Sequence, residues 1–372
     1  MGEGRNRAYK FRIYPNRDQS VLLNKTFGCC RFIWNRMLDD KIRIYKETGK
    51  MQRTTPASYK TEFPWLKEVD SLALANVQLY LEKAYKAFFR DPKIGFPNFK
   101  SKHGSRKSYT TNVVNGNICL KDHRLKLPKV GWIRVKDHRP IPDTCQLKSV
   151  TVSAESNGTY YASLLVEEQI CESQAEKAYT TEDQVLGIDY AMHELAVFSD
   201  GARAEYPQYF RRAEEKLAKE QRKLSHCVKG SKNYQKQKKK VAACHKKIRD
   251  QRRDFLHKLS HQIATAYDAV AVEDLDMKAM SRCLHFGKSV MDNGNGMFRT
   301  MLGYKLKDQG KKLIVIGRFY PSSKKCSCCG KVKQELSLSE RVYRCECGNE
   351  LDRDVNAAIN IREEGLRLLL AQ

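Results

Sequence analysis

The sequence predicts an α+β protein with several folding units, and three features of the chain support this prediction. Its first half combines short alternating segments, typical of strands, with two long amphipathic helical segments. Its second half contains short apolar strands on either side of a long, very basic helical region. Five cysteines between positions 326 and 347 indicate a further small unit built around a metal ion.

Length and charge define the general class of the protein. The chain has 372 residues, of which 41% are hydrophobic, enough to build cores for roughly two to four folding units. Its formal net charge is +26, and self-repulsion of that size destabilises a compact chain unless a partner neutralises it. Nucleic acid is the expected partner, because each Lys or Arg that neutralises a phosphate releases a counterion. No membrane partner is expected, since the chain has no apolar run of roughly 18 residues and no basic amphipathic anchor.

The N-terminal residues and the cysteines favour a cytoplasmic, nucleoid-associated protein of prokaryotic type. The first residues lack the apolar segment of a signal peptide, and Asn6 replaces the Ser or Thr that myristoylation requires. The chain contains thirteen cysteines. Without an export signal we expect reduced thiols and one metal site instead of a disulfide framework.

The first 90 residues predict one strand and two helices. Residues 7–14 alternate apolar and basic side chains before Pro15, as expected for an amphipathic strand. Residues 18–48 predict a helix whose apolar stripe is explained by core packing. A second helix follows, with Asp70 or Ser71 as its cap. Its apolar face consists of Leu74, Val77, Leu81, Ala84 and Phe88.

Residues 91–112 form a basic, turn-rich stretch in which aromatic residues alternate with Lys and Arg. This combination suits phosphate contacts together with stacking on bases or riboses. An ordinary solvated loop is the alternative explanation. The candidate nucleic-acid-binding residues are Phe96, Phe99, Lys100, Lys102, Arg106 and Lys107.

Residues 118–166 predict a series of short strands. Asn157-Gly158 lies between the segments 148–153 and 160–165 and is a strong hairpin signal. We expect a small β-barrel or sandwich whose first strand is the segment 7–14, with the helices inserted between. Residues 170–183 are polar and Glu-rich, as expected for a linker.

A new unit is predicted from residue 185 onward. Residues 185–190 and 195–198 predict neighbouring strands, and residues 211–266 predict a helical hairpin interrupted near Gly230-Ser231. Residues 211–260 hold 18 Lys and Arg against 5 Asp and Glu. Although a charge run is usually a solvated helix face, an imbalance this large favours contact with nucleic acid. Further along, residues 269–273 and 313–316 predict strands, and residues 354–370 predict the last helix.

Three acidic residues follow these elements: Asp189 and Glu273 end two predicted strands, and Asp354 starts the last helix. A strand with Asp, its hairpin partner, a later strand ending in Glu and a helix starting with Asp form a ribonuclease-H-like arrangement. Phosphodiester cleavage by two Mg²⁺ ions needs carboxylates from separate elements over one phosphate. Glu273-Asp274 could instead be a helix cap, and Asp352 or Asp354 could cap the last helix. Between Asp352 and Asp354 we choose Asp354, because it directly precedes the helical run at positions 355–358.

The cysteines have the spacing of a zinc ribbon. Cys326-x-x-Cys329 and Cys345-x-Cys347 lie 15 residues apart and offer four thiolates to a tetrahedral Zn²⁺ ion. The second pair is tighter than usual, so Cys328 remains an alternative ligand. With four protein ligands the site should be structural and not catalytic.

Taken together, these residues resemble the TnpB family, transposon-encoded relatives of the compact type V CRISPR effector nucleases. The resemblance covers nearly the whole chain. The most specific part is the segment 345–361. The other parts are residues 9–15, 29–34, 95–102, 187–189, 195–201, 272–275 and 321–330.

Membership would imply an RNA-guided DNA endonuclease. A guide RNA, either a transposon-end omega RNA or a CRISPR-type guide, would pair with the target strand of double-stranded DNA. The protein would read a short motif beside the target, and one RuvC site would hydrolyse both strands in turn. The resemblance implies Asp189, Glu273 and Asp354 as catalytic residues and ligands of two Mg²⁺ ions. It implies Cys326, Cys329, Cys345 and Cys347 as ligands of one Zn²⁺ ion.

The resemblance also implies a domain layout. Residues 1–16 and 113–180 would form a split β-barrel wedge domain, with a helical recognition domain at 17–112 inserted. Residues 181–318 and 350–372 would form the ribonuclease-H-like RuvC domain. Residues 319–349 would form an inserted zinc ribbon that binds target nucleic acid. We expect a monomer bound to RNA.

The chain departs from the family pattern at two places. Ala191 stands where the family commonly has Gly, and the second cysteine pair is shortened. Two other functions remain open from the sequence alone. One is an RNA-guided DNA-binding regulator that does not cut, against which the intact carboxylates argue. The other is a DNA transposase acting without RNA, which would not require the long first half of this chain.

Overall fold

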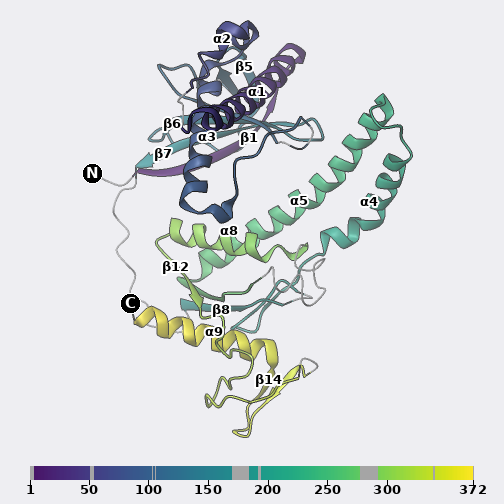
Figure 1. The fold of residues 1–372 in the computed structure, drawn as a ribbon. Coiled ribbons are helices and arrows are strands. Elements are labelled where there is room, and N and C mark those ends of the chain that lie inside the picture. Colours follow the sequence, from purple (N-terminus) through teal and green to yellow (C-terminus); the bar gives the residue numbers. More distant parts are fainter. Residues whose placement is uncertain are drawn as a thin grey trace. The chain divides into compact units, whose positions relative to one another are not determined.

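The computed structural model divides the chain into two compact units, Met1–Cys171 and Glu172–Gln372 (Figure 1). The linker expected at residues 170–183 lies outside the described residues. The structure describes residues 4–50, 54–102, 104, 106–169, 184–191, 194–276, 292–337 and 340–371.

The first unit contains a seven-stranded sheet in which every pair of neighbours is antiparallel. The strand order is β2-β6-β7-β1-β5-β4-β3. The strands are β1 (Gly4–Tyr14), β2 (Lys107–Asn112), β3 (Cys119–Lys121), β4 (Arg124–Leu127), β5 (Gly131–Lys136), β6 (Gln146–Ala154) and β7 (Tyr160–Gln169).

The sequence correctly predicts how this sheet is split. β1 precedes the helices and lies between β7 and β5, which follow them. Its side chains alternate as predicted, and Tyr9, Phe11 and Ile13 are buried. The β6–β7 hairpin turns at Asn157-Gly158, where Gly158 has a φ of 90° that favours glycine. The sheet does not close into a barrel, since its order ends at β2 and β3. It curls into a half-barrel.

Two long helices pack against this sheet and against each other. α1 (Arg17–Thr48) starts with a capping box between Asn16 and Gln19. α3 (Ser71–Arg90) starts at Asp70, whose side chain accepts a hydrogen bond from the backbone of Leu72, so the predicted cap is confirmed. Between and after them lie α2 (Tyr59–Glu62), η1 (Pro64–Glu68) and η2 (Pro92–Ile94). One continuous core joins buried residues of α1, α3 and the sheet.

The second unit contains a five-stranded mixed sheet in the order β10-β9-β8-β11-β12. β8 and β12 both run parallel to β11, whereas β9 is antiparallel to β8 and to β10. The strands are β8 (Val185–Asp189), β9 (Ala196–Phe198), β10 (Arg203–Ala204), β11 (Ala269–Glu273) and β12 (Lys312–Ile316). The predicted strands are confirmed with shifts of one residue at most at their N-terminal ends.

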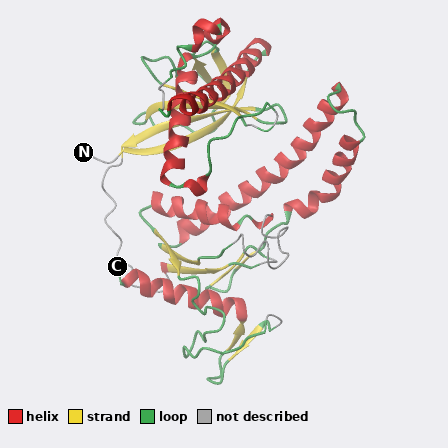
Figure 2. Cartoon of the chain, in the orientation of Figure 1, coloured by secondary structure: helices red, strands yellow, loops and turns green. Residues whose placement is uncertain are grey.

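Helices cover both faces of this sheet (Figure 2). Leu186 and Ile188 of β8 pack against α5 (Lys232–Ala266) and α8 (Asn295–Asp308). The alternate residues Val185 and Gly187 face α9 (Arg353–Leu370) on the other side. Because strand side chains alternate between faces, Asp189 belongs to the α9 face.

The predicted helical hairpin is confirmed as α4 (Tyr209–Ser225) packed along α5. Most side chains of both helices are exposed, and Leu217, Ile248 and Leu256 are among the few buried apolar ones. The Gln237 amide ties the helices together by donating to the backbone and the side chain of Glu220. The hairpin therefore exposes its basic residues over most of its length.

A short two-stranded sheet precedes the last helix. β13 (Val342–Arg344) pairs with β14 (Glu350–Asp352), and α9 starts directly after β14. Among the described helices of both units, none combines the length and the apolar character needed to cross a membrane.

Candidate active site and metal centre

Asp189 and Glu273 end two adjacent strands at the same edge of the second sheet. β8 and β11 run parallel, and their register pairs Ile188 with Val272, the residues just before the two acids. Gly187 and Ala271 are also paired, and an added Cβ at Gly187 or at Gly365 would meet α9 and Ala271 respectively. The two carboxylates thus share one edge and the face that α9 covers.

Asp354 lies in the first turn of α9. Asp352 is the N-cap, because its Oδ1 accepts hydrogen bonds from the backbone of Asp354 at 3.0 Å and of Val355 at 3.1 Å. The other carboxylate oxygen of Asp352 pairs with Arg203 at 2.9 Å. The capping role that the sequence left open for either acid therefore belongs to Asp352, which leaves Asp354 available for another task.

A close contact between α9 and β8 brings Asp354 to the strand ends. A Cβ atom at Gly187 would lie 2.1 Å from the carbonyl oxygen of Ala358, far inside any real contact. The helix backbone therefore lies directly on the strand, which only glycine allows. Since Ala358 is one helical turn after Asp354, this contact positions the start of α9 near Asp189.

The electrostatics of Asp189 respond to the other two acids. Burial raises the pKa of Asp189 well above its usual value, and the charges of Glu273 and Asp354 raise it further. Burial also raises the pKa of Glu273, while a hydrogen bond from the Ser322 hydroxyl opposes this shift. Three neighbouring carboxylates offer a donor set of hard oxygens that suits a divalent cation.

Several neighbours of this acidic site were not found from the sequence. Ser322 binds Glu273, and Asp274 pairs with Arg299 at 3.1 Å and with Arg318 at 2.9 Å. These two arginines hold the pKa of Asp274 below its usual value, which marks it as an ion-pair residue. Phe319 follows Arg318 and is 94% exposed. No spacing in the sequence connects these residues to the acids, since only the fold brings them together.

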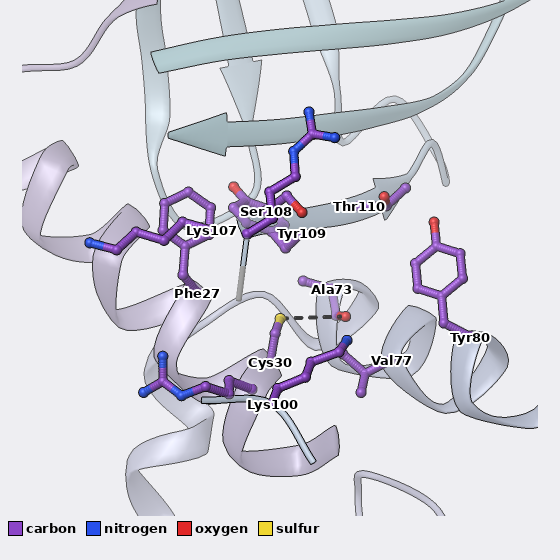
Figure 3. Close-up of a pocket in the computed structure, with 12 residues that line it drawn as sticks. Phe27, Cys30, Ala73, Val77, Tyr80, Lys100, Lys107, Ser108, Tyr109 and Thr110 are labelled. Atoms are coloured by element: carbon purple, nitrogen blue, oxygen red, sulfur yellow. Dashed lines mark hydrogen bonds between the residues drawn. The ribbon is translucent and has the colours of Figure 1, made fainter. Parts of the chain in front are cut away.

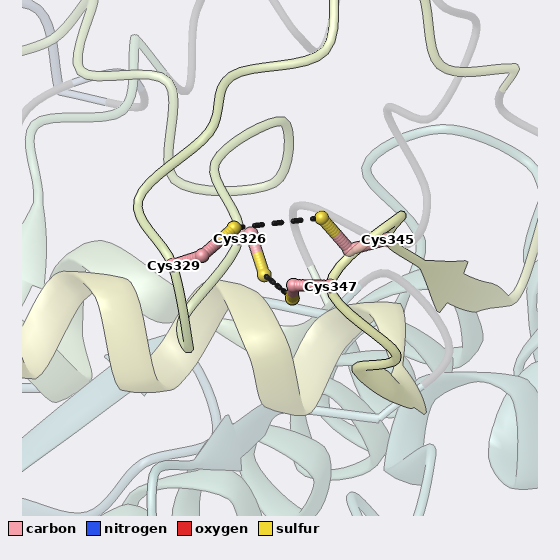
Figure 4. Close-up of side chains that lie close together, drawn as sticks. All are labelled: Cys326, Cys329, Cys345 and Cys347. Carbon is pink, nitrogen blue, oxygen red and sulfur yellow. Dashed lines mark hydrogen bonds between the residues drawn. The ribbon is translucent and has the colours of Figure 1, made fainter.

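The four predicted cysteines form one cluster. Their sulfur atoms all lie within 4.8 Å of one another, with 3.7 Å between Cys326 and Cys347 and 3.6 Å between Cys329 and Cys345 (Figure 4). Four thiolates at about 2.3 Å from one Zn²⁺ ion would lie roughly 3.8 Å apart. Cys328 is exposed and is not part of this cluster, so the alternative ligand is not favoured.

The environment of Cys326 favours the thiolate form that binds metal. Burial opposes the charge, but hydrogen bonds from the backbones of Cys329 and Cys328 and from the Asn349 side chain outweigh it, and the pKa of Cys326 falls to about 6. Gly330 and Gly348 follow the two cysteine pairs with φ of 75° and 89°. This left-handed backbone, which favours glycine, allows the tight turn that follows each cysteine pair.

The basic segment of the first unit is partly a packing element. Lys100 is half-buried with its Nζ 3.6 Å from the centre of the Trp34 ring, and burial lowers the pKa of Lys100. Phe96 contacts Tyr85 and Phe88 edge-on and is 43% exposed. Lys107 is the first residue of β2, so the last six residues of the predicted 17–112 segment belong to the sheet. Exposed side chains are found at Phe99, Lys102, Arg106 and Lys107.

Three of these basic residues line a cavity of about 120 Å³ between α1, α3 and β2 (Figure 3). Lys107 lies on the β2 side, and Lys100 and Tyr80 lie on the helix side. At its base the Cys30 thiol donates to the backbone of Ala73. The cavity therefore combines positive charge with aromatic groups, although its aromatics are Phe27, Tyr80 and Tyr109 and not the predicted Phe96 and Phe99.

Comparison with known proteins places the chain in a family. Residues 168–284 match the IS605 OrfB family, described as "Probable transposase", and residues 296–361 match the "Cas12f1-like, TNB domain". A Streptomyces pristinaespiralis protein named as an RNA-guided DNA endonuclease is 35% identical over 97% of this chain and 89% of its own length. The chain belongs to the TnpB family.

A second TnpB-type relative and a solved structure agree with this assignment. The Escherichia coli protein InsQ, also named as an RNA-guided DNA endonuclease, is 32% identical over 98% of this chain and 94% of its own. A cryo-EM structure of a Cas12f1–sgRNA–target DNA complex has the same fold, with a TM-score of 0.57 and 13% identity. It covers 96% of this chain and 99% of the Cas12f1 chain.

One match differs from the structure of this TnpB-family chain. Residues 1–50 match a family described as "Helix-turn-helix domain". In the structure, the described part of that range consists of strand β1 and the single long helix α1. The long core-facing stripe of α1 and the pairing of β1 with β7 explain why no second helix forms there.

Proposed function

We propose that this protein is an RNA-guided DNA endonuclease that hydrolyses phosphodiester bonds at Asp189, Glu273 and Asp354. A guide RNA pairs with the target strand beside a short motif that the protein reads, and a single RuvC site cuts the DNA. Support comes from two relatives named for this activity and from the excess positive charge of the chain.

A single observation carries the catalytic assignment: Asp189 and Glu273 end adjacent parallel strands on the face that α9 covers, and Asp354 lies in the first turn of α9. The charges of Glu273 and Asp354 accordingly raise the pKa of Asp189. A protein has no structural reason to bury like charges together, and a divalent cation would relieve this repulsion. The strand order β10-β9-β8-β11-β12, with the acids at strand ends and at a helix start, also supports a ribonuclease-H-like RuvC domain.

The protein's own residues then supply position and charge. Two Mg²⁺ ions, once bound, supply an activated water and stabilise the leaving oxygen. The strand ends hold Asp189 and Glu273, and the capped start of α9 holds Asp354. The Arg353 guanidinium lies 3.4 Å from Asp354. Because strands and a helix start are rigid, the carboxylates need little reorganisation when the cations bind.

The cysteine cluster is proposed to hold one structural Zn²⁺ ion. The sulfur spacing fits tetrahedral thiolate ligands, and Cys326, Cys329, Cys345 and Cys347 fill all four positions. Residues 319–349 would then be a zinc ribbon that binds target nucleic acid, inserted between the parts of the RuvC domain. Its metal-bound form would fix the chain between β12 and α9.

Two basic regions are proposed to contact RNA and DNA. One is the α4–α5 hairpin, whose exposed Lys and Arg face solvent over its length. The other is the segment with Phe96, Phe99, Lys100, Lys102, Arg106 and Lys107, which leads from the proposed helical recognition domain into strand β2 of the proposed wedge sheet. Both suit backbone phosphates and stacked bases more than a small substrate. We propose a monomer bound to guide RNA in the cytoplasm, near the nucleoid.

A plasmid cleavage assay tests this function. The purified protein with its RNA should cut a matched target in Mg²⁺ and should not cut in EDTA. Asp189→Ala should reduce cleavage on the order of 10³-fold or more, while guide RNA still co-purifies. Glu205→Ala, which removes an exposed acid of the same unit, should cut normally.

The same assay separates the two alternatives. A regulator would bind its target and leave the plasmid intact under every condition. A transposase acting without RNA would still cut after nuclease treatment of the purified protein. Either result, or full cleavage by Asp189→Ala, contradicts the proposal.

A further inference from the structure

Ser322 links the acidic site to the loop that carries the first cysteine pair. Its hydroxyl donates a hydrogen bond to Oε1 of Glu273, and its side chain is almost fully buried. A carboxylate held at one oxygen can no longer rotate freely, and its second oxygen stays available for a cation. Ser322 thus fixes the orientation of Glu273, which nothing on β11 itself does.

Two buried asparagines of α9 hold this loop in place. The Asn360 side-chain amide donates to the carbonyl oxygens of Ser322 at 2.8 Å and of Lys325 at 2.7 Å. One turn earlier, Asn356 donates to the same Lys325 carbonyl at 2.8 Å and accepts from the backbone of Ser327 at 3.0 Å. We name Asn356 and Asn360 the amide clamp.

The amide clamp is an unusual choice for the buried face of a helix. Both asparagines are fully buried, where an apolar residue would avoid the cost of desolvating an amide. The Oδ1 atom of Asn360 even lacks a hydrogen-bond partner among the described residues. A buried amide is retained despite this desolvation cost when its hydrogen bonds define a geometry that apolar packing cannot define.

The amide clamp also brackets the start of the cysteine cluster. Its bonds reach Lys325 and Ser327, the residues on either side of the buried Cys326. The helix that carries the clamp also carries Asp354, two residues before Asn356. One network of hydrogen bonds therefore joins Glu273, the two residues that flank the first cysteine and the helix that carries the third acid.

We propose that Ser322, Asn356 and Asn360 are positioning residues that set the Glu273 carboxylate against Asp354. Through them, order at the cysteine cluster improves cation binding at the acidic site. This inference rests on the proposed function, since it assumes that Glu273 binds a catalytic cation. The three residues act through Glu273 and do not touch the substrate.

Cation binding without turnover tests the role of Ser322. Mn²⁺ binding to the protein–RNA complex is measured from the electron paramagnetic resonance signal of free Mn²⁺, and the Mg²⁺ dependence of cleavage is measured in parallel. Ser322→Ala should raise both half-saturation concentrations about tenfold, the size expected for one hydrogen bond to a charged group. Ser322→Thr keeps the hydroxyl and should stay within about twofold of wild type.

Ser323→Ala is the matched control, because this exposed neighbour makes no contact with Glu273 in the described structure. It should leave both concentrations unchanged, and all three variants should melt as wild type does. Wild-type cation dependence in Ser322→Ala overturns the inference. Asp189→Ala in the same assay tells the two proposals apart: if it is inactive while Ser322→Ala is normal, only the inference fails.

A double-variant comparison tests the amide clamp. Asn360→Leu should weaken Mn²⁺ binding, and adding Ser322→Ala should weaken it little further, since both changes release the same carboxylate. If the double variant weakens Mn²⁺ binding by the product of the two single factors, the two residues act independently, and this result would contradict the clamp. If Asn360→Leu does not fold, Asn356→Leu takes its place.

The link to the cysteines has its own measurement. Cys347→Ser disrupts the cluster and should weaken Mn²⁺ binding at the acidic site severalfold. In the Asn360→Leu protein the same cysteine change should have a smaller effect. Equal effects in both backgrounds, or none in wild type, would show that the cysteine cluster does not act through the clamp.

Discussion

The acidic site and the cysteine cluster lie in the same unit but collect their residues over very different stretches of chain. The cysteines come from positions 326 to 347, two short turns that the local backbone can fold around one ion. The acids come from positions 189 to 354 and depend on a parallel strand pair and on a helix that rests on it. A local site can form with its ligand, whereas a distributed site needs the whole unit folded first.

The largest effect should come from separating α9 from β8. Gly187→Val places a side chain where the carbonyl of Ala358 lies, so the helix must move and Asp354 with it. We expect loss of cleavage, on the order of 10³-fold, together with a lower melting temperature. Plasmid cleavage and thermal melting measure both effects.

Gly296→Ala is the control for this change. No atom lies within 4 Å of an added Cβ there, and the position is helical without positive φ. It should cut normally and melt no lower than wild type. Normal cleavage by Gly187→Val would mean that the acids do not depend on this contact.

Loss of one cysteine ligand should unfold only the residues around the cysteine cluster. Cys326→Ser should reduce bound zinc, measured by atomic absorption, from about one ion per chain to nearly none. Protease should then cut within residues 319–349 of the second unit while the first unit, Met1–Cys171, stays intact. Cys328→Ser should keep its zinc, because this thiol lies outside the cluster. Zinc loss in Cys328→Ser instead would reassign the fourth ligand.

Stability without metal should reveal the repulsion among the acids. The pKa of Asp189 is higher in the folded than in the unfolded chain, so the folded state binds more protons. Stability from this group is therefore full below its ordinary pKa near 4 and falls as pH rises through the raised value. In EDTA at pH 8, Asp189→Asn should melt about 2–4 °C higher than wild type, the shift expected for roughly 1 kcal/mol.

The gain from Asp189→Asn should shrink at lower pH and in excess Mg²⁺. Melting curves from pH 5 to 8 measure this trend. Asp200→Asn is a useful comparison, because this exposed carboxylate lies apart from the acidic site and accepts hydrogen bonds from the Tyr267 hydroxyl and the Ala202 backbone. A lower melting temperature for Asp189→Asn in EDTA would show that the acids do not repel one another.

The smallest effect concerns Phe319, in the segment that connects the two sites. Its ring is exposed beside the Asp274 ion pairs, where a base of the substrate strand could stack on it. Phe319→Ala should slow cleavage about tenfold, as expected for the loss of one stacked base. Bound zinc should not change. Val228→Ala removes another exposed apolar group, at the hairpin tip, and should have no effect on either quantity.

The sequence predicted those parts of the fold that follow from local patterns. Alternation predicted β1 and β11, and the apolar periodicity predicted α1, α3 and α9 within a few residues. The four cysteines were predicted because a metal site of this kind is defined by spacing alone. The three acids were chosen from the order of elements: Asp189 and Glu273 lie at the ends of paired strands and Asp354 in the first turn of α9, and their catalytic role stays a prediction.

Other features could not be predicted because they depend on packing between distant segments. In the sequence, Ser322, Asn356 and Asn360 look like ordinary polar residues. Their hydrogen bonds form only because the loop packs against α9. A small β-barrel or sandwich was expected where the sheet is an open half-barrel, since strand patterns do not encode whether β2 and β3 meet. Lys100 was assigned to nucleic acid, yet its ammonium group lies over the Trp34 ring.

The close contact between α9 and its sheet, made at glycines without a Cβ atom, limits how this protein can be shortened or diversified. At Gly187 and again at Gly365, an added Cβ would overlap the neighbouring element. Two such points along one helix prevent it from sliding or rotating, so a deletion inside α9 cannot be absorbed by a new register. Shortened variants should therefore keep this helix intact and lose residues from the exposed tip between Ser225 and Lys232 instead.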